Sequence, residues 1–231
     1  MPNPNRNRLL AGLSEGDLGL LKPHLEPLPV EVRHSIEEIN KPIKYIYFPE
    51  EGIISVVAAG TDGKEIEVGL IGREGMTGIV VVMGNHRAPH KVYVQVRGHA
   101  QRMNVAPLRE ALEASATLRP FLLKFAQAFM VQTSHTAIAN GRGTLEQRLA
   151  RWLLMARDRL DGDELPLTHE FLSLMLGVRR PGVTEAVQKL EERGLIDASR
   201  GHILLRDRKG LEKIAGGFYG APEAELKRLM N

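Results

Sequence analysis

The chain has 231 residues, of which 43% are hydrophobic and 26% charged, so it is long enough for one large or two smaller globular domains. It contains no cysteine, which excludes disulfides, thiolate catalysis, iron–sulfur clusters and cysteine-based zinc sites. The formal net charge is only +3, so a nucleic-acid-binding surface would have to gather its basic residues locally.

The N-terminal sequence MPNPNRNR is polar and lacks the hydrophobic core of a secretion signal. No apolar run in the chain approaches the ~20 residues that a membrane-spanning helix needs. We therefore expect a disordered N-terminal arm, no membrane association and a cytoplasmic location of the bacterial type.

The first half of the chain changes from helical to β-rich. Residues 9–25 predict one or two short helices, with Ser14 as an N-cap and Asp17 three positions later. From residue 30 to 105, short β-branched runs are separated by turn signals, of which Asp62-Gly63 is a strong hairpin signal. The alternation of KEIEV at 64–68 indicates a strand with one face in water. Many short strands at this spacing indicate a β sandwich, barrel or jelly roll.

Two helices follow the strands. Pro107 opens a short helix through about Ala114, and a longer helix runs from about Thr117 to Asn140. One side of the longer helix repeats in steps of four and three, which is typical of a coiled-coil seam. The predicted seam, and with it the predicted dimer interface, consists of Leu118, Leu122, Phe125, Phe129, Gln132 and Thr136, and continues to Ala139.

The longer helix has a second apolar side at Phe121 and Leu123, which is able to face the β domain. A helix with two apolar sides favours a dimerisation role, and burial against its own chain alone is the alternative. The seam becomes polar at Gln132 and Thr136. These two residues either fix the register of a dimer or line a ligand site between subunits.

A glycine-rich break comes next. The sequence Asn140-Gly141-Arg142-Gly143 predicts a hinge at Asn140, Gly141 and Gly143. Thr144 and Gln147 then form a capping box for an amphipathic helix over 145–160. The lone Trp152 is expected in the core of that helix's apolar face. Four arginines are expected to point to solvent: Arg148, Arg151, Arg157 and Arg159.

Residues 167–195 predict two short helices joined by a tight turn. Thr168 is suited to cap the first helix, because its hydroxyl accepts a hydrogen bond from a backbone N–H. Gly177 ends that helix where a positive φ is required. The second helix begins near Arg180, and Pro181 falls in its first turn, where a missing N–H costs little. The apolar faces comprise Phe171, Leu172, Met175 and Leu176 in the first helix and Val183, Ala186, Val187 and Leu190 in the second.

Two helices with a short glycine-containing turn are typical of a helix-turn-helix, whose second helix enters the major groove of DNA. An ordinary helical hairpin is the alternative. Arg179 and Arg180 favour DNA binding, because two cations at a helix N-terminus oppose the helix dipole and bring no intrinsic stability. A phosphate or a guanine edge explains them. Residues 196–205 then predict a β hairpin, or wing, around Ser199-Arg200-Gly201, followed by a helix from about Asp207 to Ala215.

The order of β-rich domain, long helix, glycine hinge, helix, helix-turn-helix and wing resembles the Crp/Fnr family of bacterial transcription regulators. The resemblance covers nearly the whole chain and is strongest over 145–207, in LEQRLARWLLMARDRL, LPLTHEFLSLMLGV and VQKLEERGLI. It implies an α+β fold with three parts. These are a jelly roll of the cyclic-nucleotide-binding type (1–116), a dimerisation helix (117–140) and a winged helix-turn-helix DNA-binding domain (141–231).

The resemblance implies a homodimer on double-stranded DNA with a two-fold-symmetric site, no catalytic activity, and RNA polymerase as a partner. By position in the family's motif, Thr168 and His169 touch phosphate, Arg179 replaces a phosphate-contacting Ser, and Arg180 reads guanine through O6 and N7. The implied DNA-binding set is Thr168, His169, Arg179, Arg180, Thr184, Glu185, Lys189, Ser199 and Arg200.

Two positions depart from the family's pattern. Pro181 replaces a frequent base-reading Glu, so that contact is expected to be absent. Glu185 stands where the best-known type of member has Arg. The Glu185 carboxylate either accepts from a cytosine amino group or pairs with Arg180 or Lys189. The target sequence is therefore expected to differ from the familiar one.

The effector half matches the family less well. The family's cyclic-nucleotide binders use a Gly-Glu pair for the ribose and an Arg-Ser or Arg-Thr pair for the cyclic phosphate. Neither pair occurs in the corresponding region of this chain, which runs from residues 75–78 to residues 90–92. We therefore expect no tight cAMP binding by the usual mode. His90 and Lys91 either hold another anion or are solvated strand-end residues.

No cofactor is expected, and the effector stays open. Haem would need its ligands from scattered histidines and from Pro2 near the N-terminus. The histidines have no close spacing, and lone histidines are mostly surface or satisfied core groups. These are His24, His34, His86, His90 and His99.

Two other functions are alternatives to DNA binding. A small-ligand-binding module with a helical protein-interaction domain would explain the modest net charge. An enzyme is not expected, because no nucleophile–base pair, phosphate-binding loop or metal cluster stands out in the sequence.

Overall fold

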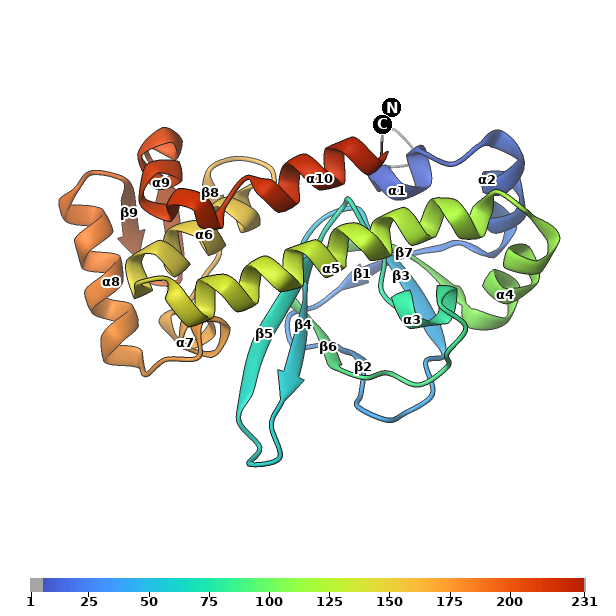
Figure 1. Ribbon diagram of the computed structural model, residues 1–231, viewed down its shortest axis with the longest axis horizontal. Helices are drawn as coiled ribbons and strands as arrows, with labels where there is room; N and C mark the ends of the chain where they lie inside the picture. The colour runs from blue at the N-terminus through green and yellow to red at the C-terminus, as the bar shows by residue number, and fades with distance from the viewer. Residues whose placement is uncertain (1–5, 231) are drawn as a thin grey trace. The chain divides into compact units, whose positions relative to one another are not determined.

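The structure, a computed structural model, describes residues 6–230 (Figure 1). Of the predicted N-terminal arm, residues 1–5, among them Pro2, lie outside the described residues. The arm prediction is wrong for the rest. Asn7 is fully buried, and its Oδ1 caps α1 (Arg8–Ala11) by accepting from the Leu10 N–H. The Nδ2 of Asn7 donates to two backbone carbonyls at 2.8 and 2.9 Å, so the side chain satisfies buried polar groups.

The described residues fold into two compact units. The first contains the chain up to Val56, Ile71–Met130 and the end from Leu226 onwards. The second contains Val57–Leu70 and Val131–Glu225. The sequence predicts domain boundaries after residues 116 and 140, between successive elements of the chain. The observed units instead share the long helix, and Val57–Leu70 from the β-rich half belongs to the unit that contains the helix-turn-helix.

The β-rich half forms two sheets in which most neighbouring strands are not consecutive in the chain, which is typical of the predicted jelly roll. The three-stranded sheet is antiparallel and has the order β1-β7-β3. Its strands are β1 (Glu26–Val30), β7 (Gly98–Asn104) and β3 (Tyr45–Pro49). The four-stranded sheet has the order β2-β6-β4-β5 and consists of β2 (Ser35–Glu37), β6 (Lys91–Val96), β4 (Ile53–Ala59) and β5 (Glu65–Ile71).

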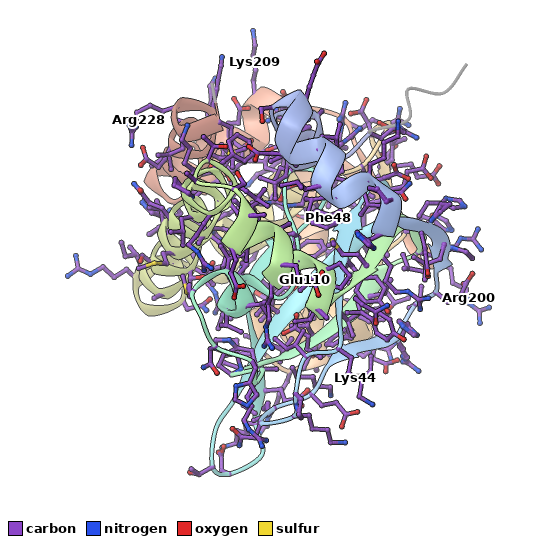
Figure 2. The ribbon with its side chains drawn as sticks, turned by 90° about the vertical axis from the view of Figure 1, so that its right-hand side faces the viewer. Lys44, Phe48, Glu110, Arg200, Lys209 and Arg228 are labelled. Atoms are coloured by element: carbon purple, nitrogen blue, oxygen red, sulfur yellow. The ribbon has the colours of Figure 1, made fainter. Side chains whose placement is uncertain are left out.

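Short helices surround these strands. They are α2 (Glu15–Leu21), the 3-10 turn η1 (Lys22–His24), α3 (Ile79–Val82) and α4 (Val105–Ala114). Ser14 caps α2 as predicted, since its hydroxyl accepts from the Asp17 N–H at 3.1 Å. Gly63 has a φ of +76°, as the predicted Asp62-Gly63 turn requires. Phe48, labelled in Figure 2, is fully buried in the core of the first unit.

The long helix α5 (Leu118–Arg142) buries four of the six predicted seam residues inside its own chain, so these four are unsuited to a dimer interface. Leu118, Leu122, Phe125 and Gln132 are at most 7% exposed, and Phe129 and Thr136 are half-buried. The Phe125 ring fills the space beside Gly75, where an added Cβ would lie 2.1 Å from the ring. Buried side chains have no surface to offer a second chain, so the alternative interpretation, burial against the same chain, holds for these four residues.

The opposite face of α5 is exposed and carries four apolar side chains alongside the polar Gln127 and Ser134. Leu123, Met130 and Ile138 are 37%, 61% and 49% exposed, and Ala137 is exposed between the last two. Leu123, Met130 and Ala137 are spaced by seven residues, the repeat of a coiled-coil seam. We call these four residues the α5 strip.

The predicted hinge at Gly141 is not where the helix ends. Helix α5 continues through Gly141 to Arg142, and the chain leaves the helix at Gly143. A Cβ at Gly143 would lie 2.7 Å from the Ala139 carbonyl oxygen, so only glycine fits there. Asn140 accepts from Arg148 Nε at 3.0 Å, which ties the end of α5 to the following helix.

The second unit continues with α6 (Leu145–Arg157), which has the predicted capping box between Thr144 and Gln147. Trp152 is buried as predicted. The elements that follow are β8 (Glu164–Leu165), α7 (His169–Leu176), α8 (Arg180–Glu192), β9 (Ile196–Ser199), β10 (His202–Leu205), α9 (Arg208–Ala215), the 3-10 turn η2 (Gly216–Phe218) and α10 (Ala221–Met230). The antiparallel wing pair β9–β10 is confirmed, with β8 added as a third strand on β10.

The expectation that the four arginines at 148–159 point to solvent is wrong for Arg151 of α6 and for Arg159 just after it, which are 5% and 6% exposed. Arg148 is half-buried and donates to Asn140 and the Leu176 carbonyl. Arg151 Nε donates to the Phe218 carbonyl at 2.9 Å, and Arg159 donates to the Met155 carbonyl at 2.8 Å. These hydrogen bonds allow guanidinium groups to be buried. Among residues 6–230, no helix combines the length and apolar character that a bilayer crossing requires.

Candidate nucleic-acid interface

The turn between α7 and α8 has the backbone geometry that the sequence predicts. The Thr168 hydroxyl accepts from the Phe171 N–H at 3.3 Å and caps α7. Gly177 has a φ of +61°, the left-handed conformation that ends the helix. The next residue closes the turn, since the Val178 N–H donates to the Ser173 carbonyl at 3.0 Å. The chain is therefore redirected into α8 within three residues.

Helix α8 has a fully apolar inner face and a polar outer face. Val183, Ala186, Val187 and Leu190 are at most 3% exposed, which confirms the predicted buried face. The outer face carries Arg180, Pro181, Glu185 and Gln188, all exposed. Gln188 was not among the predicted site residues, although its spacing of three and seven from Glu185 and Pro181 places it on the same face.

The two arginines at the start of α8 are the strongest feature of this surface. Arg179 is the N-cap residue but makes no capping hydrogen bond, and Arg180 is the first helical residue. Both side chains are exposed, and among residues 6–230 neither guanidinium has a hydrogen-bond or ion-pair partner. Two cations at a helix N-terminus are unfavourable in isolation, so the site is arranged for an anionic or hydrogen-bond-accepting ligand.

Glu185 pairs with Lys189 rather than with Arg180. The Lys189 ammonium lies 2.9 Å from Glu185 one turn earlier and 3.1 Å from Glu146 at the start of α6. Glu146 also pairs with Arg193 at 3.2 Å. The hydrogen bond to Glu185, followed by the one to Glu146, raises the pKa of Lys189 above its usual value. In the DNA-free protein the Lys189 charge is therefore shared between two carboxylates.

Sequence reasoning missed Glu146. The Glu185–Lys189 pair has an i,i+4 spacing that a sequence can reveal. The pairing of Glu146 with Lys189 joins two helices that are 43 positions apart in the chain, and no local pattern predicts it.

His169 and Thr184, both predicted site residues, are brought together. The Nδ1 of His169 lies 3.2 Å from the Thr184 hydroxyl oxygen, and that hydroxyl donates to the Arg180 carbonyl at 3.2 Å. Since the hydroxyl proton is used on the carbonyl, Nδ1 of His169 is the donor to Thr184. The start of α7 is thereby linked to the first turn of α8.

The wing presents the remaining predicted residues. Ser199 and Arg200 are exposed at the turn between β9 and β10, where Gly201 has a φ of +82° (Figure 2). An ion pair between Asp197 and Arg206, with 2.6 Å between Oδ2 and Nε, closes the hairpin below that turn. Contact of these residues with DNA stays a prediction.

The region that corresponds to the family's cyclic-nucleotide site contains buried side chains. Met76 is 1% exposed, and the Phe125 ring occupies the space beside Gly75. Glu74 is 7% exposed, and its Oε1 accepts from the Gly72 N–H at 3.2 Å. Burial lowers the pKa of His90 below its usual value, so this imidazole is neutral at pH 7 and does not provide a cation for an anionic ligand.

A buried carboxyl lies near this region. Glu37 is 7% exposed, and its Oε1 accepts from the Gly78 N–H at 2.7 Å. Burial raises the pKa of Glu37 to about 7. In the part of the chain that the structure describes, no group of three His, Asp or Glu side chains is placed to hold a metal ion.

Comparisons with known proteins agree with this geometry. Residues 147–214 match the model of the Crp-like helix-turn-helix domain. A comparison with curated protein sequences finds no match. Among solved structures, FixK2 from Bradyrhizobium japonicum has a TM-score of 0.72 at 16% identity, with 84% of this chain and 98% of that chain covered.

Two further structures are similar. A transcriptional regulator of the Crp/Fnr family from Eubacterium rectale has a TM-score of 0.70 at 19% identity, with 91% of this chain and 99% of that chain covered. A CRP-family transcriptional regulator from Thermus thermophilus has a TM-score of 0.68 at 18% identity, with coverages of 82% and 97%. The chain therefore carries a Crp-like helix-turn-helix domain, and the predicted α+β fold of Crp/Fnr regulators is confirmed.

Proposed function

We propose that this chain, with its Crp-like helix-turn-helix domain, is a homodimeric, sequence-specific DNA-binding transcription regulator and not an enzyme. The observation that carries the proposal is the exposed, unpartnered pair Arg179–Arg180 at the N-terminus of α8, directly after the left-handed turn at Gly177. In helix-turn-helix proteins this end of the second helix meets the base edges of the major groove.

Each exposed group has a role in this proposal. The Arg180 fork donates to O6 and N7 of a guanine, while Arg179 and the wing residues Ser199 and Arg200 contact phosphates. The Thr168 hydroxyl and His169 approach the backbone at the start of α7. Pro181 has no donor for a base, so the neighbouring position is not read by a hydrogen bond from that residue.

The dimer of this proposal forms through the α5 strip rather than through the seam that the sequence suggested. Leu123, Met130, Ala137 and Ile138 lie exposed along one face of α5, at coiled-coil spacing. A second copy related by a two-fold axis would bury the same strip on both chains. The two α8 helices would then meet successive half-sites of a two-fold-symmetric DNA element.

The effector of this regulator is not cAMP bound in the family's usual mode. The Phe125 ring fills the space beside Gly75, and the sequence lacks the Arg-Ser or Arg-Thr pair for a cyclic phosphate. A buried phosphate without charge-assisted hydrogen bonds would be unfavourable. Only that binding mode is therefore excluded, and RNA polymerase is the partner through which DNA binding would change transcription.

The test is selection of bound duplexes from a randomised DNA pool, followed by titration of the selected site at increasing salt. Arg180→Ala is expected to cost about 1–3 kcal/mol of binding free energy and to relax the preference for one base pair. Arg97→Ala, an exposed arginine between β6 and β7, is the matched control and should bind as the unchanged protein does. A protein without DNA affinity even at low salt would contradict the proposal and favour the ligand-binding module with a helical protein-interaction domain.

A further inference from the structure

Glu67 of β5 is buried. The alternating sequence of this strand predicts that its face is exposed to water. The side chain is 4% exposed, and its Oε1 accepts a hydrogen bond from Nε1 of Trp152 on α6 at 2.6 Å. Both residues belong to the second unit. Since burying a carboxylate is costly without compensation, this position calls for an explanation.

Part of the compensation comes from Arg151, the neighbour of Trp152 in the chain. Desolvation lowers the pKa of Arg151 to about 10, while the charges of Glu223 and Glu67 act in the opposite direction. Besides its bond to Phe218, Arg151 donates from Nη2 to the Thr136 hydroxyl at 3.2 Å. Glu67 thus accepts from a buried N–H donor on α6, and its charge partly offsets the desolvation of Arg151, which is itself hydrogen-bonded to Phe218 and Thr136.

The residues on either side of Glu67 also contact the helical elements. Ile66 packs against the turn of the helix-turn-helix, where an added Cβ at Gly177 would lie 3.0 Å from the Ile66 Cδ1. The Gln132 side chain on α5 pairs with the Leu70 backbone, accepting from its N–H at 2.7 Å and donating to its carbonyl at 3.2 Å. One strand therefore contacts α5, α6 and the turn before α8.

We infer that Glu67 is a positioning residue for DNA binding, through which β5 holds α6 and the helix-turn-helix turn in the orientation that binds DNA. The inference rests on the proposed function. Strands β4 and β5 belong to the four-stranded sheet, and β5 also touches α6 and the turn before α8 through the non-covalent contacts of Glu67 and Ile66 (Figure 1). Glu67 makes the charged one of these contacts.

The surroundings of Glu67 allow the contact to be removed without collapse. An enclosed cavity of about 20 Å³ is lined by Glu67, Thr136, Arg151 and Trp152 among others. This volume is enough for about one water molecule, which can partly replace a missing carboxylate. Removal of the side chain is therefore expected to loosen α6 rather than unfold the unit.

The protein contains a built-in probe of this contact, because Trp152 is its only tryptophan. The experiment compares the full-length protein with Glu67→Ala, Glu67→Gln and Asp62→Asn. The last removes one negative charge at the exposed tip of the same hairpin and is the control. The measurements are tryptophan emission, the Kd for the selected duplex, and circular dichroism at the same temperature to establish folding.

Glu67→Ala is expected to shift Trp152 emission to longer wavelength and to weaken DNA binding about tenfold, since the binding-competent orientation becomes a minor population. Glu67→Gln keeps an acceptor for Nε1, so its emission stays near that of the unchanged protein and its loss of affinity is smaller, about threefold. Asp62→Asn should alter neither quantity. Because glutamine has nearly the shape of glutamate, the residual loss in Glu67→Gln measures the contribution of the charge, and the further loss in Glu67→Ala that of the acceptor and of packing.

Unchanged emission and Kd in a folded Glu67→Ala variant would overturn the inference. If that variant fails to fold, the near-isosteric Glu67→Gln decides: an unchanged Kd contradicts the inference, and an intermediate loss supports it. Failure of the unchanged protein to bind any duplex would instead refute the proposed function, and the emission change would still report whether Glu67 holds Trp152.

Discussion

The ammonium group of Lys189 on α8 lies 3.1 Å from the Glu146 carboxylate on α6, so the proposed recognition helix is tied to the helix beneath it by an ion pair. Lys189 also pairs with Glu185, and Glu146 also pairs with Arg193. The network withholds Lys189 of α8 and Arg193, the residue that ends this helix, from a DNA backbone and adds negative charge beside the proposed binding surface. Its loss is expected to change DNA binding in a defined direction.

Glu146→Gln is expected to raise affinity for non-cognate duplex DNA, because Lys189 and Arg193 lose a competing carboxylate. The slope of log K against log salt should become steeper by about 1 for each additional phosphate that these cations neutralise. A salt titration by fluorescence anisotropy measures this slope. Glu110→Gln on the exposed face of α4 removes the same charge in the first unit and is the control (Figure 2). A weaker affinity in Glu146→Gln would contradict the prediction.

The α5 strip predicts the oligomeric state. Met130 is 61% exposed at the centre of the strip, and a charge there would be buried at the proposed two-fold interface. Met130→Glu is therefore expected to shift the protein from the mass of two chains to that of one in sedimentation velocity. Met83→Glu places the same change at another exposed methionine, 51% accessible, and should leave the dimer intact. Equal masses for the two variants would argue against the strip as the interface.

Gly177 predicts a stability effect at the turn. An alanine there must adopt a φ of +61°, which costs about 1–2 kcal/mol, and its Cβ would press on Ile66. Gly177→Ala is expected to lower the free energy of unfolding by at least about 1 kcal/mol in urea denaturation. Gly19→Ala lies within α2 with no atom near the added Cβ, and should stabilise by about 0.5–1 kcal/mol. A Gly177→Ala variant as stable as the unchanged protein would show that the turn tolerates a side chain.

Glu37 predicts a pH dependence of stability. Burial raises its pKa from 4.5 to about 7, so between these values the folded chain keeps a proton that the unfolded chain loses. This contribution is fully present below about pH 4.5 and falls away as the pH rises towards 7, by an amount on the order of 3 kcal/mol. Glu37→Gln retains an acceptor for the Gly78 N–H and does not titrate.

The difference in unfolding free energy between Glu37→Gln and the unchanged protein should therefore grow in favour of the variant from pH 5 to 7.5, as measured by urea denaturation at both values. Taking the difference cancels the other titrating groups, which the two proteins share. A constant difference across this range would mean that Glu37 has the same pKa in the folded and unfolded chains.

Local elements could be predicted from the sequence because their determinants lie within a few residues. The Thr144–Gln147 capping box, the Thr168 cap and the left-handed Gly177 each depend on hydrogen bonds or backbone angles of one turn. The apolar face of α8 follows from helical periodicity alone. The order of these elements also indicated the fold, since it leaves few ways to bury their apolar faces.

The tertiary structure decided which of several similar faces is buried. Both sides of α5 are apolar in the sequence, and only packing shows that Phe125 fills the space at Gly75 while Met130 stays exposed. β8 is too short to be recognised until it pairs with β10.

The same is true of the charged contacts. Glu67 has the sequence signature of a solvent-exposed strand residue, and only its partner Trp152, 85 positions away, allows its burial. Glu146 and Lys189 likewise meet only when α6 and α8 pack together. Caps, turns and periodicity depend on neighbours in the chain and are determined by the sequence alone. The cost of burying a charge depends on a distant partner, so only the folded structure decides it.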